Sequence, residues 1–209
     1  PLDHISAPTR RLNEYIAAAV MRPLPGDVIE RARHHILDTV AAMMSGSRLR
    51  PGQMAIRYVA SLGGVPEASV VGAQMRTTAV NAALANGMLA HADETDDSHA
   101  PSRTHPGCAV IPAALAIAER AHASGAAFLA AVVLGYDVAR RVLEAFGGYP
   151  AHNEPGWHST GTCGTFGAAA AAARVLGLDA ARAASAIGIA ASFSGGLWAF
   201  IHDGAMTKR

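Results

Sequence analysis

The sequence is short of charged and aromatic side chains. Asp, Glu, Lys and Arg make up 16% of the 209 residues, the formal net charge is +1, and no long basic run is present. A nucleic-acid-binding surface needs clustered Lys and Arg, and an aromatic content of 5% is too sparse for a base-stacking platform. We therefore expect no nucleic-acid partner.

Cysteine and long apolar runs are scarce as well. Cys108 and Cys163 are the two cysteines, and their spacing fits neither a disulfide framework nor a zinc ribbon. Gly, Pro, Asn or charged residues interrupt each long apolar segment before it reaches the length of a bilayer. Residues 1–16 lack the apolar centre of a signal peptide. We expect a cytoplasmic protein with reduced, buried thiols and no membrane partner.

What the sequence does contain is apolar periodicity typical of helices. In residues 25–46, apolar side chains recur at steps of three and four, which predicts one buried stripe. Similar patterns predict eight helices, over residues 9–24, 25–46, 51–64, 77–94, 106–125, 125–148, 161–178 and 179–196. Only residues 67–72 resemble a strand. The predicted fold is all-α, a compact multi-helix bundle with buried Ala- and Gly-rich central helices, formed by residues 1–209 as one helical domain.

One connection between predicted helices is crowded with titratable groups. Residues 91–107, HADETDDSHAPSRTHPG, hold three histidines and four acids, which are Asp93, Glu94, Asp96 and Asp97. They cannot all be core residues, because burying unpaired charge is costly. A solvated loop that caps the next helix through Ser102 or Thr104 is one interpretation, and a metal site is a second, although no HExxH-like spacing orders the ligands. The third is an acid–base site, in which carboxylates and imidazoles shift each other's pKa to transfer protons near neutral pH.

Two further polar segments follow. In residues 154–167, EPGWHSTGTCGTFG, His158 precedes a helix start whose N–H groups and hydroxyls could bind a carboxylate. The alternative is an N-cap followed by small residues for tight packing. In residues 194–209, SGGLWAFIHDGAMTKR, the pair Gly195-Gly196 breaks a helix and Lys208 follows a Gly-rich turn. A lone lysine of this kind is usually solvated, so that signal is weak.

Taken in this order, the segments resemble the MmgE/PrpD family, which includes 2-methylcitrate dehydratase, cis-aconitate decarboxylase and an iminodisuccinate epimerase. The matching text is ILDTVAAMMSG, NGMLAHADETDDSHAPSRTHPGCAVIPAALAIAE, GWHSTGTCGTFGAAAAAARVLGL and DGAMTKR. The resemblance covers essentially the whole chain. It implies an α-helical domain, an active site without metal or cofactor, and a homodimer. Members of the family are longer, so we expect this chain to be the N-terminal portion, with the lid domain and the rest of the site supplied elsewhere.

The resemblance also implies positions for the site. In the decarboxylases an aspartate opens a D-x-D-D-T stretch; Glu94 stands at that aspartate here and Ser98 at the threonine, with Asp93 as the neighbouring alternative. His105 matches the histidine of T-H-P, and a loop one residue longer leaves the place of His99 open. The histidine before the Gly-rich helix and the lysine of T-K complete the match. The implied catalytic residues are Asp93, Glu94, His99, His105, His158 and Lys208, and the implied substrate-binding residues are Asp97, Ser98, Ser159, Thr160 and Thr162.

The function implied by the resemblance is that of a lyase of hydroxy-di- or tricarboxylic acids, foremost a 2-methylcitrate dehydratase-like elimination of water. His105 or His158 would abstract a proton next to a carboxylate, and Lys208 would hold a substrate carboxylate. The changes from Asp to Glu94 and from Thr to Ser98 argue against the decarboxylase itself. An epimerase or isomerase, a decarboxylase of a related polycarboxylate, and a non-catalytic helical subunit are the alternatives. Expected partners are a polycarboxylate substrate and either a second copy or a chain that carries the lid domain.

Overall fold

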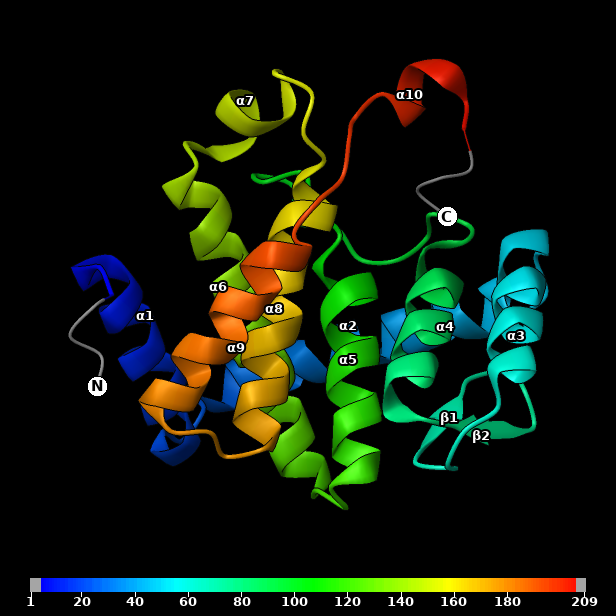
Figure 1. Cartoon of the computed structure of the whole chain (residues 1–209), viewed down its shortest axis with the longest axis horizontal. Helices are drawn as coiled ribbons and strands as arrows, with labels where there is room; N and C mark the ends of the chain where they lie inside the picture. Colours follow the sequence, from blue (N-terminus) through cyan, green and yellow to red (C-terminus); the bar gives the residue numbers. More distant parts are fainter. Residues whose placement is uncertain (1–4, 206–209) are drawn as a thin grey trace.

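The computed structural model describes residues 5–205, and its helices run mostly up and down beside one another (Figure 1). A 3-10 turn (Ala19–Met21) follows the first helix. The helices are α1 (Ala7–Ala18), α2 (Gly26–Gly46), α3 (Arg50–Leu62), α4 (Ala79–His91), α5 (Pro106–Arg120), α6 (Gly125–Ala145), α7 (Gly148–Asn153), α8 (Ser159–Val175), α9 (Ala180–Phe193) and α10 (Phe200–Asp203).

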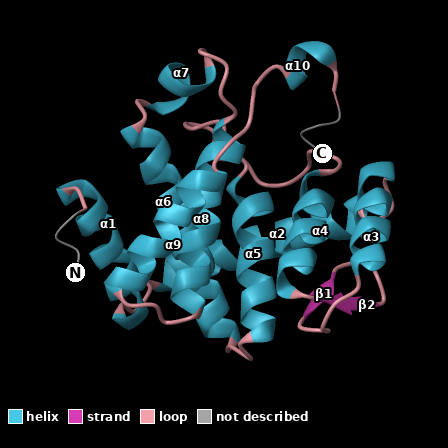
Figure 2. Ribbon diagram, in the orientation of Figure 1, coloured by secondary structure: helices cyan, strands magenta, loops and turns pink. Residues whose placement is uncertain are grey.

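The predicted all-α class and the eight predicted helices are confirmed. The predicted strand is β1 (Ala68–Val70), which pairs antiparallel with β2 (Met75–Thr77) in a small hairpin that the sequence did not reveal (Figure 2). The short helices α7 and α10 were also missed, because a segment of one or two turns carries too few apolar positions to show a period. Among the residues that the structure describes, no helix is long and apolar enough to cross a bilayer.

Small residues allow the central helices to approach closely. α5 packs against both α4 and α8, and α8 packs against α6. A β-carbon added at Gly167 of α8 would lie 2.6 Å from the carbonyl oxygen of Gly135 in α6, and one added at Gly135 would lie 2.8 Å from the carbonyl oxygen of Gly167. The two backbones are therefore in direct contact, which only glycine permits at this point.

The alternation of helix direction gathers the polar segments at one end of the bundle. The end of α4, the start of α5, helix α7, the start of α8 and the residues that follow α9 all lie at the upper end in Figure 1. Asp179 caps the start of α9 at the opposite end by accepting a hydrogen bond from the N–H of Arg182. Connections widely separated in sequence therefore become neighbours.

Candidate active site

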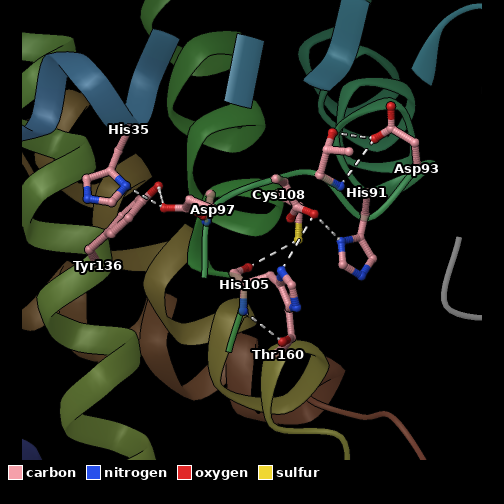
Figure 3. A network of polar contacts seen from close by, with 11 residues as sticks. His35, His91, Asp93, Asp97, His105, Cys108, Tyr136 and Thr160 are labelled. Carbon is pink, nitrogen blue, oxygen red and sulfur yellow. Dashed lines mark hydrogen bonds and ion pairs between the residues drawn. The ribbon is translucent and has the colours of Figure 1, made fainter. Parts of the chain in front are cut away.

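The connection between α4 and α5 places its two adjacent buried acids on opposite sides. Asp96 contacts His91 and His105, whereas Asp97 contacts His35 of α2 and Tyr136 of α6. Figure 3 shows Asp97 facing His35 and Tyr136 on one side, with His91 on the other. The connection therefore separates two groups, which we call the Asp96 cluster (His91, Asp96 and His105) and the Asp97 cluster (His35, Asp97 and Tyr136).

The Asp96 cluster places a buried carboxylate between two imidazoles. Asp96 Oδ1 lies 2.8 Å from Nδ1 of His91 and 3.6 Å from Nδ1 of His105. The side chain of Asp96 is fully buried and that of His91 is 5% exposed, whereas 23% of the His105 side chain is exposed. The two rings meet edge to face, with centroids 4.9 Å apart. His105 is therefore the member of this cluster that reaches the surface of the domain.

Three atoms of the Asp96 cluster have no hydrogen-bond partner among residues 5–205, although all are buried: His91 Nε2, Asp96 Oδ2 and His105 Nδ1. The cluster also carries donor types that divalent cations prefer, all within 4.8 Å of one another. His91 Nδ1 and Asp96 Oδ1, however, are hydrogen-bonded to each other, so a metal ion that used these two atoms as ligands would have to replace that hydrogen bond. The absence of a metal, implied by the resemblance, stays a prediction.

The Asp97 cluster joins three helices. Asp97 Oδ1 accepts the N–H of Gly107 at the start of α5, at 2.9 Å. Its Oδ2 accepts the hydroxyl of Tyr136 at 2.8 Å and lies 2.9 Å from Nδ1 of His35. Burial and the charge of Asp97 raise the pKa of Tyr136 far above its usual value, so the phenol stays protonated and donates. A side chain at Gly107 would overlap the Asp97 carboxylate and the hydroxyl of Thr39.

A cavity of about 490 Å³ opens beside the Asp97 cluster. Ser98, His99 and Thr104 of the connection border it, opposite His35 of α2. His99 Nδ1 lies 2.7 Å from the hydroxyl of Ser102, which in turn lies 2.7 Å from the hydroxyl of Thr104. Hydrogen bonds thus hold the connection in shape on this side. Neither Ser102 nor Thr104 caps α5, whose N-cap residue is His105.

The start of α8 meets the start of α5 through one hydrogen bond. The backbone N–H of His105 donates to Oγ1 of Thr160 at 3.1 Å. The hydroxyl of Thr162 turns away, to Nε2 of His152 at 2.7 Å, and Oγ of Ser159 is buried without a hydrogen-bond partner in the described chain. This contact joins the two polar segments that the sequence presents more than fifty residues apart.

His158 belongs to a neighbouring aromatic group. It is the N-cap residue of α8, and its N–H donates to the carbonyl of Gly196 at 3.0 Å. Its ring centroid lies 5.3 Å from that of Trp198 and 5.2 Å from that of Phe200. The segment after α9 therefore folds over the start of α8, so the second and third polar segments of the sequence are in contact.

Comparison with known proteins identifies the family. Residues 10–209 match the MmgE/PrpD N-terminal domain. The chain belongs to the MmgE/PrpD family. Its similar relatives include the cis-aconitate decarboxylase-like protein oryM of Aspergillus oryzae, 33% identical over 96% of this chain and 43% of the relative. The cis-aconitate decarboxylase of Aspergillus terreus is 30% identical over 89% of this chain and 39% of that protein, and the human one is 33% identical over 80% and 36%. The chain spans less than half the length of these curated relatives.

The family resemblance inferred from the sequence is thus confirmed. The residues predicted for the site stay a prediction, and the structure places them in several groups. His105 and Thr160 are in contact, and Asp97, Ser98 and His99 border one cavity. The pKa of Asp93, which burial alone would raise, is held below its usual value by hydrogen bonds from Ser45 and Thr95. Glu94 is exposed, with a φ of 56°. Lys208 lies outside the described residues.

Two residues of the Asp96 cluster, His91 and Asp96, were not assigned a role from the sequence. Both belong to the titratable segment 91–107, and Asp96 was counted among its acids. A loop has no repeating register, so the sequence could not indicate which of the adjacent acids faces the two imidazoles. The only available signal was composition, which places the pair in the right segment.

Proposed function

We propose that the complete protein is a lyase that acts on a polycarboxylic acid by acid–base catalysis. The observation that carries this proposal is the position of His105. Its backbone is tied to Thr160 of α8, its Nδ1 faces a buried carboxylate, and part of its ring is exposed. An imidazole held in this way can exchange a proton with a substrate near neutral pH. The family and the names of its relatives support the lyase class.

Two reactions of this class fit the same imidazole. In a dehydration, the base removes the proton next to a carboxylate, the C–H electron pair forms the double bond, and the protonated hydroxyl leaves as water. In a decarboxylation, the C–C bond to a carboxylate breaks, CO₂ leaves, and a proton is delivered to the carbon that keeps the electron pair. Either step needs one positioned group that carries a proton.

Each reaction has an observation in its favour. By the resemblance, Glu94 and Ser98 stand where the decarboxylases carry Asp and Thr, which argues against the decarboxylase itself and leaves the elimination of water from a hydroxy-tricarboxylate as the first alternative. The printed names of the relatives favour decarboxylation of cis-aconitate. The protein purified from its natural source, incubated in turn with 2-methylcitrate and cis-aconitate, separates the two by formation of the unsaturated product or release of CO₂.

The role of His105 is tested in the same complete protein. We expect His105→Gln to lower kcat by about 10²–10⁴, the usual contribution of a general acid or base, with an unchanged circular dichroism spectrum. His34→Gln is the matched control, because His34 is exposed on α2 and its ion-pair partner in the described chain is Glu30 of the same helix. Full turnover by His105→Gln would refute the proposed role. No turnover of any polycarboxylate by the natural protein would favour the non-catalytic subunit instead.

We also propose that the chain associates, as a homodimer or with a chain that carries a lid domain. Several large apolar side chains are exposed; among them, Val80 is 76% exposed, Phe193 79% and Leu197 66%. Covering such groups stabilises an assembly. The native mass and chain composition of the purified protein test this proposal, and a monomer of this chain alone would contradict it.

A further inference from the structure

Asp96 is an unusual carboxylate, because no Lys or Arg among residues 5–205 forms an ion pair with it. Its side chain is fully buried, and within the described part of the chain its ion-pair partners are the two imidazoles of His91 and His105. A buried carboxylate is costly unless it is paired and hydrogen-bonded. A group retained at such a cost calls for a role beyond packing.

The geometry indicates how the protons are placed around Asp96. An ionised carboxylate can only accept, so at 2.8 Å His91 must donate its Nδ1 proton to Oδ1. His91 thereby acts as a clamp that orients the carboxylate. Oδ1 also faces Nδ1 of His105 at 3.6 Å, too long for a hydrogen bond in this state but close enough to favour a proton on that nitrogen.

The exposed part of the His105 side chain does not include Nδ1. Nδ1 is buried, whereas 23% of the side chain is exposed. In a neutral imidazole with its proton on Nδ1, Nε2 carries the lone pair. The backbone bond to Thr160 and the edge-to-face contact with His91 keep the ring in place.

We infer that Asp96, clamped by His91, is a positioning residue that holds the proton of His105 on Nδ1 and so leaves Nε2 as the atom that exchanges protons with the substrate. The inference rests on the proposed function of His105. When Nε2 takes a proton from substrate carbon, the resulting imidazolium has its Nδ1–H beside Asp96, which stabilises the charge. The same pair stabilises the imidazolium from which a proton is delivered.

The surroundings of His105 contain few other groups that could do this. Within residues 5–205, the titratable side chains in contact with it besides Asp96 include His91 of α4 and Cys108 of α5, whose Sγ lies 3.2 Å from the carbonyl of His105. Helix α8 contributes the uncharged Thr160. Asp96 is therefore the one acid within 4 Å of the ring nitrogens among residues 5–205.

The experiment compares Asp96→Asn with the wild type in the complete natural protein. We expect kcat to fall by about 10²–10⁴ with little change in KM, because the wrong nitrogen then carries the proton. The pH–rate profile changes as well, since the negative charge beside the imidazole is gone. In ¹H–¹⁵N spectra of histidine-labelled protein, the His105 signals change from the Nδ1–H to the Nε2–H tautomer. His91→Gln loosens the clamp and gives a smaller change in the same directions.

Asp179→Asn is the control, because Asp179 caps α9 at the opposite end of the bundle, and asparagine caps a helix start about as well as aspartate does. It should leave the His105 tautomer, kcat and pH profile unchanged. If Asp96→Asn keeps the wild-type kcat, pH profile and tautomer while His105→Gln is inactive, the inference about Asp96 is wrong and the proposed function survives. If His105→Gln is fully active, both are wrong.

Two measurements on the wild type keep the inference testable even if Asp96→Asn does not fold. A dominant Nε2–H tautomer of His105 in the unmodified protein would overturn it, and a dominant Nδ1–H tautomer supports it. A divalent cation that is bound stoichiometrically by the purified wild type and is absent from the His91→Gln variant would overturn the inference as well. In that case the three side chains would be ligands rather than a clamp and a base.

Discussion

Replacing Tyr136 by phenylalanine removes one hydroxyl from the Asp97 cluster and leaves the ring in place. Tyr136 donates to Oδ2 of Asp97 at 2.8 Å, and the Asp97 side chain is only 5% exposed. A hydrogen bond to a charged group contributes about 1.5–3 kcal/mol, and solvent cannot replace the lost donor at a buried oxygen. Gly107 N–H and His35 continue to hold the carboxylate, each at 2.9 Å. We therefore expect Tyr136→Phe to lower the free energy of unfolding by about 2 kcal/mol.

The matched control is Tyr15→Phe. The Tyr15 hydroxyl also donates to an aspartate at 2.8 Å, but the Asp137 side chain is 23% exposed and Arg141 bonds to the same oxygen at 2.7 Å. Water and the guanidinium can replace the lost donor there, so the expected loss is about 0.5–1 kcal/mol.

The assay is urea unfolding of both variants and the wild type, followed by circular dichroism. For a domain of roughly 200 residues, a loss of about 2 kcal/mol corresponds to a fall in Tm of about 4–8 °C, which differential scanning fluorimetry checks independently. Equal losses for Tyr136→Phe and Tyr15→Phe, or a larger loss for Tyr15→Phe, would refute the argument from burial of the acceptor.

Two further predictions concern acid stability and helix packing. Burial lowers the pKa of His152 in the folded protein, so the unfolded chain binds a proton more readily. The free energy of unfolding is therefore unaffected by this group above pH about 6.5, and it falls as the pH drops through that value towards the folded-state pKa. Urea midpoints between pH about 7.5 and about 5.5 should therefore fall more for the wild type than for His152→Gln, and identical slopes would contradict this. Gly135→Ala should cost about 1–3 kcal/mol, because its β-carbon would lie 2.8 Å from the Gly167 carbonyl. The control Gly188→Ala, whose β-carbon meets no atom within 4 Å in α9, should instead stabilise by about 0.5–1 kcal/mol; destabilisation by both would sink the packing argument.

The helices could be predicted because their signals are local. The three- and four-residue steps of α2, the N-cap of α9 and the glycine after α3 each lie within a few residues of the structure that they specify. The hairpin partner β2 could not be predicted from the sequence. A strand of three residues with an exposed arginine shows no alternation of apolar and polar residues, and it forms because β1 pairs with it.

The site divides along the same line. The local sequence was enough to mark 91–107 and 154–167 as polar segments and to match them to the family. In the structure these two segments are in contact through His105 and Thr160. It was not enough to separate Asp96 from Asp97, which are adjacent in sequence and face different helices. That separation depends on which way the chain turns between α4 and α5.

The sequence by itself determined the all-α class, the positions of the long helices and membership of the MmgE/PrpD family, because periodicity, caps and motif text are properties of short stretches. Only the tertiary structure decided that Asp96 lies between His91 and His105. His91, Asp96 and His105 come from the end of one helix, a loop and the start of the next helix, so they can be buried together only after α4 and α5 have packed against each other. Burial then allows the loop aspartate to position an imidazole.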